Sequence, residues 1–387
     1  MRKLPKFNMA ILIVIFMVAI TGCVQQKQLE KLGLITTQGY DTTGKNQDLI
    51  KGTSVVEKFD PMAETATKII TTYARTSKGL RQVQNLESNQ KLVSGQLRSV
   101  VYGRKIAERG IVQLVDTLNR DAAIGNMVYL TVADGTAEEI MKINKNKTNV
   151  DLGTYIYNLI KQNVEGEQII SPTLHEFNHN YYDIGKDAVL PILKVKNQDV
   201  IIDGVGLFKD DRLVGEIEQG ELFYLKILID KYKAGSQEIG INRDKIKSIL
   251  LKSEPSVNNP IYKKLYITID NIHSKTKIKL VDKKKFLFKV DIKLDSRLLE
   301  MTDPLDLSKP ASIKLLGKEV DKAMEKNVEK LLVYFRDIGI DPVGIGNEYE
   351  THLRGKQITR GEWRKKYKEA KFDVSVNNTI ERTGVID

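Results

Sequence analysis

The stretch Phe286-Leu287-Phe288-Lys289-Val290-Asp291-Ile292-Lys293-Leu294 alternates apolar and polar side chains. A period of two is typical of a β-strand that has one face on a hydrophobic core and the other in water. A shift of one residue would drive lysines into that core, so the pattern also fixes the register of the strand. Upstream, Ile278 and Leu280 alternate with Lys277 and Lys279 in the same way. The sequence therefore predicts a basic antiparallel sheet that begins near Tyr262.

A long helix is predicted after this sheet, from about Ser312 to Ile338. The apolar residues that recur at helical spacing and should form its buried stripe are Leu316, Val320, Met324, Val328, Leu331 and Phe335. The charged residues expected along its solvent-facing side are Lys318, Lys322, Lys326, Lys330, Asp321, Glu325 and Glu329. Gly339 is placed to cap the helix, and Asp341-Pro342 prevents it from resuming. A short helix around Trp363 and a final strand over residues 372–376 should follow.

The patterns in the first half of the chain predict a mixed α/β structure. A strand is expected near Leu34, mainly helical structure over residues 64–119, and a buried strand over residues 127–133. A helix should begin near Thr136, because Glu139 follows at the spacing of a capping box. Residues 143–149 are polar and predict a surface loop. Asp210-Asp211 is expected to form the turn of a hairpin within residues 195–218. A helix is expected over residues 218–233.

The fold class that these patterns predict is α+β with mixed sheets, because strands and helices segregate in the second half. A length of 387 residues suggests two or three domains. We divide the chain into a signal peptide (residues 1–22), an N-terminal α/β region (residues 23–200) and a C-terminal α+β region (residues 201–387).

The N-terminus has the features of an export signal. Arg2, Lys3 and Lys6 precede an uncharged apolar run from Met9 to Ile20, which is too short for a free-standing transmembrane helix but suits a secretory signal. The single Cys of the protein, Cys23, follows directly after Ile20-Thr21-Gly22. This arrangement resembles the bacterial lipobox, which implies cleavage before Cys23, an S-diacylglyceryl group on its sulfur and an acyl group on its amine. The alternative is an uncleaved signal anchor with an incidental Cys.

The charge of the chain has two interpretations. Lys and Arg number 61 against 50 Asp and Glu, a formal charge of +11, and residues 262–295 hold ten Lys and four Asp. Together with Arg364-Lys365-Lys366, this region would suit contact with anionic lipid headgroups. It would equally suit an ordinary solvated sheet face. Nucleic acid is not an expected partner, because no aromatic-interleaved basic motif is present.

One short motif could carry catalytic chemistry. His175-Glu176-Phe177-Asn178-His179 fits H-E-x-x-H, which on a helix places two imidazoles on one face for Zn²⁺. Asn178 and the residues that follow predict poor helix, and neither His273 nor His352 stands at a zincin spacing. We therefore expect polar surface residues at a helix–loop junction, with a zinc site as the alternative. The sequence holds no G-x-S-x-G, P-loop or G-x-G-x-x-G motif, so no catalytic residue, metal ligand or cofactor is predicted.

Several stretches carry a family resemblance when taken in order with the lipobox. They are Leu32-Gly33-Leu34-Ile35-Thr36-Thr37-Gln38-Gly39-Tyr40-Asp41; Glu108-Arg109-Gly110-Ile111 with Asn119-Arg120-Asp121; Gly204-Val205-Gly206-Leu207-Phe208-Lys209-Asp210-Asp211-Arg212-Leu213-Val214-Gly215; and Asp341-Pro342-Val343-Gly344-Ile345-Gly346 leading to Trp363. Together they resemble the Ger(x)C lipoprotein family, the C subunits of spore germinant receptors. The resemblance covers nearly the whole mature chain.

The resemblance implies a three-domain mixed α/β lipoprotein on the outer face of the spore's inner membrane. It also implies work with an A subunit and a polytopic B subunit, and no catalytic site. The leading hypothesis is thus a lipid-anchored, non-enzymatic receptor subunit. Two alternatives remain: a lipid-anchored zinc hydrolase that uses His175, Glu176 and His179, and a solute-binding lipoprotein with two similar lobes and a cleft between them.

Overall fold

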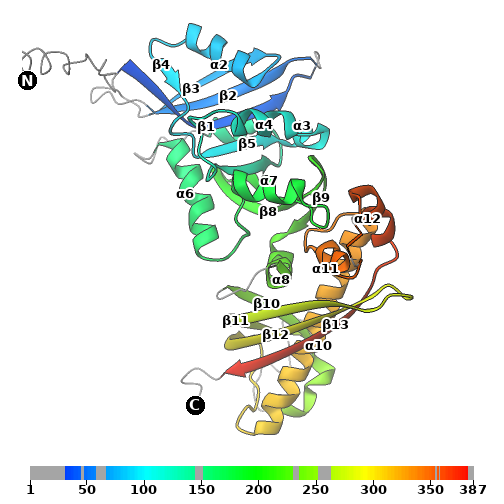
Figure 1. Cartoon of the computed structure of the whole chain (residues 1–387). Helices are drawn as coiled ribbons and strands as arrows, with labels where there is room; N and C mark the ends of the chain where they lie inside the picture. The colour runs from blue at the N-terminus through cyan, green and yellow to red at the C-terminus, as the bar shows by residue number, and fades with distance from the viewer. Residues whose placement is uncertain are drawn as a thin grey trace, which may run out of the picture.

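The computed structural model of the chain describes residues 31–44, 48–57, 67–143, 151–229, 235–251, 263–353, 355–356 and 358–381. Two β-sheets follow one another along an elongated body, the first formed by the N-terminal half and the second by the C-terminal half (Figure 1). The predicted fold class, α+β with mixed sheets, is confirmed.

The first sheet has nine strands in the order β3-β2-β1-β5-β6-β7-β8-β9, with β4 beside β1. These strands are β1 (Leu32–Thr42), β2 (Ile50–Glu57), β3 (Thr67–Ala74), β4 (Lys91–Val93), β5 (Ser99–Gly103), β6 (Tyr129–Ala133), β7 (Val189–Lys196), β8 (Asp199–Lys209) and β9 (Arg212–Glu218). β1, β5, β6 and β7 run parallel to one another, whereas β2 and β3 on one side and β8 and β9 on the other pair antiparallel. Residues 200 and 201, which flank the division made on sequence, both lie in β8.

Helices cover both faces of the first sheet. On one face, a core cluster joins the sheet to α2 (Ser77–Leu86), α3 (Arg104–Arg109), α4 (Val112–Asn119) and α7 (Leu174–Tyr182). On the other, a second cluster joins it to α5 (Ala137–Met141), α6 (Leu152–Glu165) and α8 (Gln219–Ile229). Parallel strands are commonly buried in this way, because their crossover connections carry helices.

The prediction that residues 64–119 are mainly helical is wrong, because β3, β4 and β5 lie within them. The side chains of β5 are buried on both faces, and such a strand leaves no period-two signal. The helical spacing from Ile106 to Leu118 is real, but it comes from two short helices that break at Gly110, whose φ of 125° suits glycine.

Other predictions for this half are confirmed. β6 is the expected buried strand, and the capping box of Thr136 and Glu139 opens α5. Asp210 forms the turn of the β8–β9 hairpin with a φ of 57°. The predicted loop over residues 143–149 lies, apart from Ile143, outside the described residues.

The second sheet has the order β10-β11-β12-β13. These strands are β10 (Ser236–Asn242), β11 (Lys264–Asp282), β12 (Leu287–Met301) and β13 (Lys371–Glu381). The apolar set Phe286, Phe288, Val290, Ile292 and Leu294 is buried as predicted. The short 3₁₀ helices η2 (Arg243–Lys245) and η3 (Lys247–Ile249) follow β10, and β13 lies parallel to β12.

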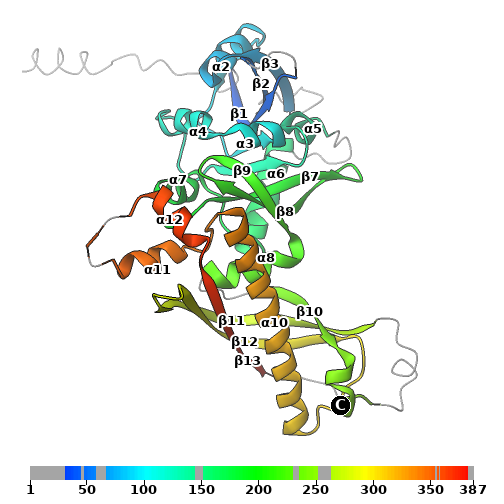
Figure 2. The ribbon, with the colours of Figure 1, turned by 90° about the vertical axis from the view of Figure 1, so that its right-hand side faces the viewer.

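The long helix α10 (Pro310–Ile338) packs against the second sheet with the predicted buried stripe (Figures 1 and 2). Gly339 caps it with a φ of 74°. Asp321 and Glu325 do not simply face solvent as predicted. Instead, their carboxylates accept the N–H groups of Asn378 and Val376, each at 3.0 Å. α10 thereby satisfies backbone donors of β13, the last strand of the sheet.

The two sheets share one continuous core. The cluster that holds α5, α6 and α8 continues through Leu225 and Ile227 of α8 into β12 and α10. The short helices α11 (Ile345–Thr351) and α12 (Arg360–Tyr367) close the end of α10 nearest the first sheet (Figure 2). Among the helices of the described residues, none combines the length and apolar character that crossing a bilayer requires.

Candidate functional site

Two candidate sites were considered from sequence, Cys23 and the H-E-x-x-H motif, and the described residues include only the second. Cys23 and the residues after it up to residue 30 lie outside the described residues, which begin at Lys31. The H-E-x-x-H motif lies within them, on α7.

The motif residues are helical, so the prediction of poor helix after Asn178 is wrong. Thr173 caps α7 by accepting the N–H of Glu176 at 3.1 Å, and the helix continues to Tyr182. The inner face of α7 carries Leu174, Phe177 and Asn180. His175, Glu176 and His179 are exposed on its outer face.

Neither remaining His approaches this outer face. His273 is on β11 of the second sheet, and His352 ends α11, where its Nδ1 lies 3.1 Å from the carbonyl of Glu348. Within the described residues, no three His, Cys, Asp or Glu side chains gather as a metal site would need.

A cluster of charged side chains lies where α12 meets the first sheet, and we call it the junction cluster: Asp187, Asp210, Asp341, Arg360 and Arg364. Arg364 donates to Asp210 at 2.7 Å and to Asp187 at 3.0 Å. Arg360 donates to Asp210 at 2.9 Å and to the carbonyl of Asp183 at 2.6 Å. Two arginines one helical turn apart thus bind the β8–β9 turn and the segment before β7.

Asp187 and Asp341 join distant parts of the chain by backbone hydrogen bonds. The N–H of Asp187 donates to the carbonyl of Asp341, and the N–H of Asp341 to the carboxylate of Asp187, each at 2.8 Å. The carboxylate of Asp341 in turn accepts the N–H groups of Gly344 at 2.9 Å and Gly346 at 2.7 Å. The Asp-Pro-Val-Gly-Ile-Gly stretch is therefore a turn into the start of α11, built around its own aspartate.

The electrostatics of the cluster follow from burial and pairing. Burial would raise the pKa of Asp210, but the hydrogen bonds from Arg364 and Arg360 outweigh it and lower that pKa. For Asp341, burial dominates and raises the pKa to about 7, although the surrounding N–H groups oppose the shift. The charge of Asp187 adds to the increase.

Backbone packing beside the cluster leaves no free space. A Cβ atom on Gly346 would lie 2.5 Å from the Cα of Gly185 and 2.8 Å from the indole of Trp363. Glycine at residue 346 thus allows the first turn of α11 to touch the backbone before β7. Trp363 stacks on Tyr349 at 5.5 Å between ring centroids and lies 5.1 Å from Tyr367.

Residues in the other stretches of the family resemblance form hydrogen bonds that hold α4 and α5 in place. The N–H of Ile111 donates to the carbonyl of Asp211 at 3.0 Å, so the start of α4 binds the β8–β9 turn. Asp41 at the end of β1 accepts the N–H groups of Ala137 and Glu138, at 2.8 and 3.0 Å. It thereby holds the first turn of α5, where an anion is favourable. Burial raises the pKa of Asp41 despite these hydrogen bonds.

The junction cluster is suited to holding elements together. Its carboxylates accept hydrogen bonds from guanidinium and backbone N–H donors that come from separate parts of the chain. Sequence analysis included Asp210 and Asp341 in the stretches that carry the family resemblance, but it did not single out Asp187 or Arg360. It also assigned Arg364 to an exposed basic cluster, whereas this side chain is 18% exposed and paired with two carboxylates. The available signal was the i, i+4 spacing of Arg360 and Arg364 on either side of Trp363.

Hollows of modest size lie elsewhere on the body. One of about 230 Å³ lies between α6, α8 and β10 and is lined by Asn163, Gln168, Ile169, Ile202, Gln219, Leu222, Phe223, Ser236 and Gln237. None of these lining residues is ionisable. The nine-stranded and four-stranded sheets on either side differ in size and topology, unlike the similar lobes that the solute-binding alternative predicts.

Two family models match the chain almost end to end. The model described as "Spore germination protein N-terminal domain" matches residues 25–195, and "Spore germination B3/ GerAC like, C-terminal" matches residues 203–384. The chain belongs to the Ger(x)C family. This family is that of the C subunits of germinant receptors, and it is not a family of known enzymes.

Relatives in the Ger(x)C family match over most of their length. The chain is 27% identical to spore germination protein GerQC of Bacillus cereus, over 97% of this chain and 99% of that protein. It is 21% identical to spore germination protein KC of Bacillus subtilis (strain 168), over 98% and 96%. The crystal structure of the GerBC protein shares the fold, with a TM-score of 0.52 and 17% identity over 89% of this chain and 97% of that one. The Asp187–Arg364 ion pair connects the two segments that the family models match.

Proposed function

We propose that this protein is a lipid-anchored, non-enzymatic subunit of a spore nutrient germinant receptor. It is held on the outer face of the spore's inner membrane and docks with the A and B membrane subunits. The observation that carries the proposal is the match of both Ger(x)C models, which together extend from residue 25 to residue 384. The lipobox-like Ile20-Thr21-Gly22-Cys23 supports the anchor.

The anchor would act through effective concentration. Residues 24–30, which we call the tether, separate the acylated Cys23 from the first described residue, Lys31. The eight Cα-to-Cα steps between these two residues reach at most about 29 Å when extended. The folded body would therefore stay close to the bilayer, which favours docking on membrane partners without strong contacts. Acylation of both the sulfur and the amine is expected to hold the chain stably, since one chain alone binds only marginally.

The anchor is tested by Cys23→Ala, with Gln25→Ala as the matched control in the same tether. We expect the Cys23→Ala chain to leave the membrane fraction after an alkaline carbonate wash, which removes proteins held only by polar contacts. Spores with this variant should also germinate more slowly on nutrients. Gln25→Ala should change neither. Full retention of Cys23→Ala in washed membranes would contradict the anchor.

Docking is tested separately by photo-crosslinking in intact spores. Crosslinking residues at Tyr73, Val214 and Tyr182, all exposed, sample β3, β9 and α7. We expect at least one of them to capture a receptor A or B subunit, identified by mass spectrometry. Capture of neither subunit from these or other exposed positions, in spores that still respond to nutrients, would contradict docking.

A further inference from the structure

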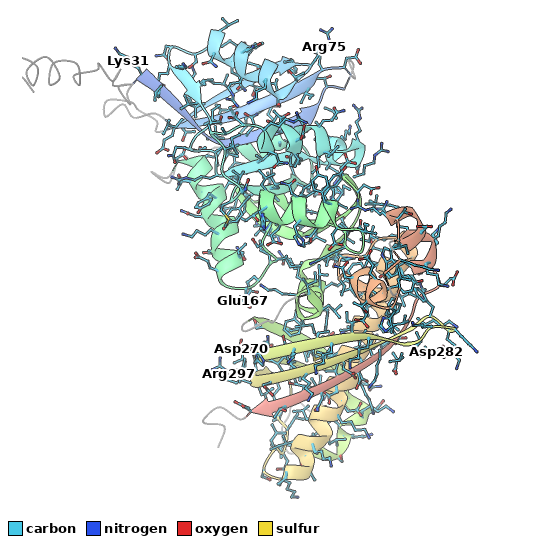
Figure 3. All side chains as sticks on the ribbon, viewed as in Figure 1. Lys31, Arg75, Glu167, Asp270, Asp282 and Arg297 are labelled. Carbon is cyan, nitrogen blue, oxygen red and sulfur yellow. The ribbon has the colours of Figure 1, made fainter. Side chains whose placement is uncertain are left out.

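The β11–β12 hairpin ends in a turn that carries lysines at every exposed position. Figure 3 shows Asp282 at the end of the hairpin, which projects from the body, with Asp270 and Arg297 at the opposite end of the same strands. Lys283, Lys284 and Lys285 follow Asp282, and Lys279 lies two residues before Val281, on the same face of β11. We call Lys279, Lys283, Lys284 and Lys285 the basic tip. All four side chains are exposed, and within the described residues none of them forms an ion pair.

The turn that carries the basic tip is held in place from beneath. The carboxylate of Asp282 accepts the N–H groups of Lys284 and Lys285 at 2.9 and 3.0 Å. Phe286 ends the turn in the left-handed region, with a φ of 50°, and is 2% exposed. Its ring lies 5.3 Å from that of Tyr349 and 6.3 Å from that of Trp363, between centroids. The lysines are therefore presented on a turn that needs no ordering before it binds.

On the rest of the sheet's open face, carboxylates stand among the basic residues, while Lys275, Lys277 and Lys293 are exposed without an ion pair among the described residues. Lys289 pairs with Asp291 at 2.9 Å, and Lys277 stands opposite Asp291 in the register of β11 and β12. Arg297 pairs with Asp270. Sequence analysis left residues 262–295 open as either a lipid-contacting basic region or an ordinary solvated sheet face. Within this range, three consecutive lysines stand together at the turn.

An exposed apolar side chain stands beside the basic tip. Val281 is 52% exposed at the end of β11, directly before Asp282. Lysines around an exposed apolar residue are the composition by which peripheral proteins contact anionic bilayers. The tip is convex and its lysines spread along a turn, which suits an extended anionic surface better than the enclosure of one small anion.

We propose that the basic tip and Val281 contact anionic phospholipid headgroups of the bilayer that holds the acyl chains, an inference that rests on the proposed function. Figure 3 places Lys31, where the tether enters the body, far from Asp282. A tether alone leaves the body free to swing about one point. A second contact at the basic tip fixes which side of the body faces the membrane and which sides face partner subunits.

The contact is tested without the acyl chains, so that its outcome is independent of the anchor. The full mature chain carrying Cys23→Ser is sedimented with vesicles of equimolar phosphatidylglycerol and phosphatidylcholine, and with vesicles of phosphatidylcholine alone. We expect binding only to the anionic vesicles, and loss of that binding as NaCl rises from about 0.05 M to about 0.5 M, because screening shortens the reach of the lysines.

Two matched triple variants locate the contact. Lys283→Gln, Lys284→Gln and Lys285→Gln together should lower the partition coefficient roughly 100-fold, as expected for three basic residues at an anionic surface. Lys275→Gln, Lys277→Gln and Lys293→Gln remove the same charge from the open face and should lower it only a few-fold. Val281→Ser should give an intermediate loss. Both triples change exposed residues, and equal melting temperatures will verify their folding.

Any of the following outcomes would contradict the assignment of the basic tip to a lipid contact. Equal losses in the two triples would mean that net charge alone drives binding. No binding of the Cys23→Ser chain to anionic vesicles would remove the lipid contact, whether or not the anchor is real. Slower germination of spores with the tip triple, combined with unchanged vesicle binding, would assign the basic tip to an acidic protein surface instead. Competition by inorganic phosphate at low concentration would indicate a small-anion site.

Discussion

Strands β5 and β12 bury their side chains in different ways. Every residue of β5 (Ser99–Gly103) is buried, because helices cover both faces of the first sheet. Along β12, buried residues alternate with exposed or half-buried ones as far as Ser296, because α10 covers one face and the other is open. A strand's environment, more than its composition, thus decides whether the sequence carries a period-two signal.

The largest expected effects test this difference at neighbouring residues. Phe288→Ala in β12 should lower the free energy of unfolding by about 4 kcal/mol, whereas Lys289→Ala beside it should change it by less than about 0.5 kcal/mol. In β5, Val100→Ala and Val101→Ala should both be costly, by about 2 kcal/mol each, since both side chains are fully buried. Urea unfolding measures all four. A tolerated Val100→Ala or Val101→Ala would contradict a first sheet covered on both faces.

The same comparison explains what the sequence could predict. In the second half, β12, α10 and the Gly339 cap follow directly from periodicity, because each element has one buried and one exposed face. In the first half, β5 lacks that contrast, β3 carries apolar Ile69 and Tyr73 on its exposed side, and β4 has only three residues, so all three were wrongly assigned to helix. Cys23 was assigned from a motif and remains a prediction. The junction cluster was only half anticipated, because pairing between Asp187 and Arg364, 177 residues apart in sequence, leaves no local pattern.

The next expected effect concerns the contact between the two halves. Arg364→Ala would leave Asp187, whose side chain is 7% exposed, and Asp210 without this partner. Breaking a buried pair should cost roughly 3 kcal/mol of unfolding free energy. Arg364→Lys should restore only part of it, because an ammonium cannot reach two carboxylates in the fork geometry of arginine. Exposed Lys365→Ala is the control. Thermal unfolding of Arg364→Ala identical to the control would mean that the junction is held by its aromatic packing alone.

A smaller effect should appear as a pH dependence at the same junction. Because burial raises the folded-state pKa of Asp341 from 3.8 to about 7, the folded state binds this proton more tightly than the unfolded state. The stabilisation is therefore present at low pH and is lost as pH rises towards 7, by an amount on the order of 2 kcal/mol between pH 5 and pH 7.

Asp341→Asn should flatten that part of the pH profile, since asparagine remains neutral and keeps a carbonyl acceptor. Asp321, whose pKa burial raises to about 6, contributes a slope of the same sign, and Asp321→Asn serves as the comparison within the second half. Urea unfolding at several pH values measures both. A profile of Asp341→Asn that matches the parent chain would mean that Asp341 is ionised in the folded protein throughout this range.

The position of β13 after α10, α11 and α12 in sequence has a consequence for the order in which the second sheet can be completed. β13 lies parallel to β12 and supplies N–H groups to Asp321 and Glu325 of α10, yet it comes after α10, α11 and α12 in sequence. The second sheet therefore cannot be finished until residues 371–381 have been synthesised. A premature stop before residue 371 would leave β12 as an unprotected edge, so a chain truncated there should be prone to aggregation and proteolysis.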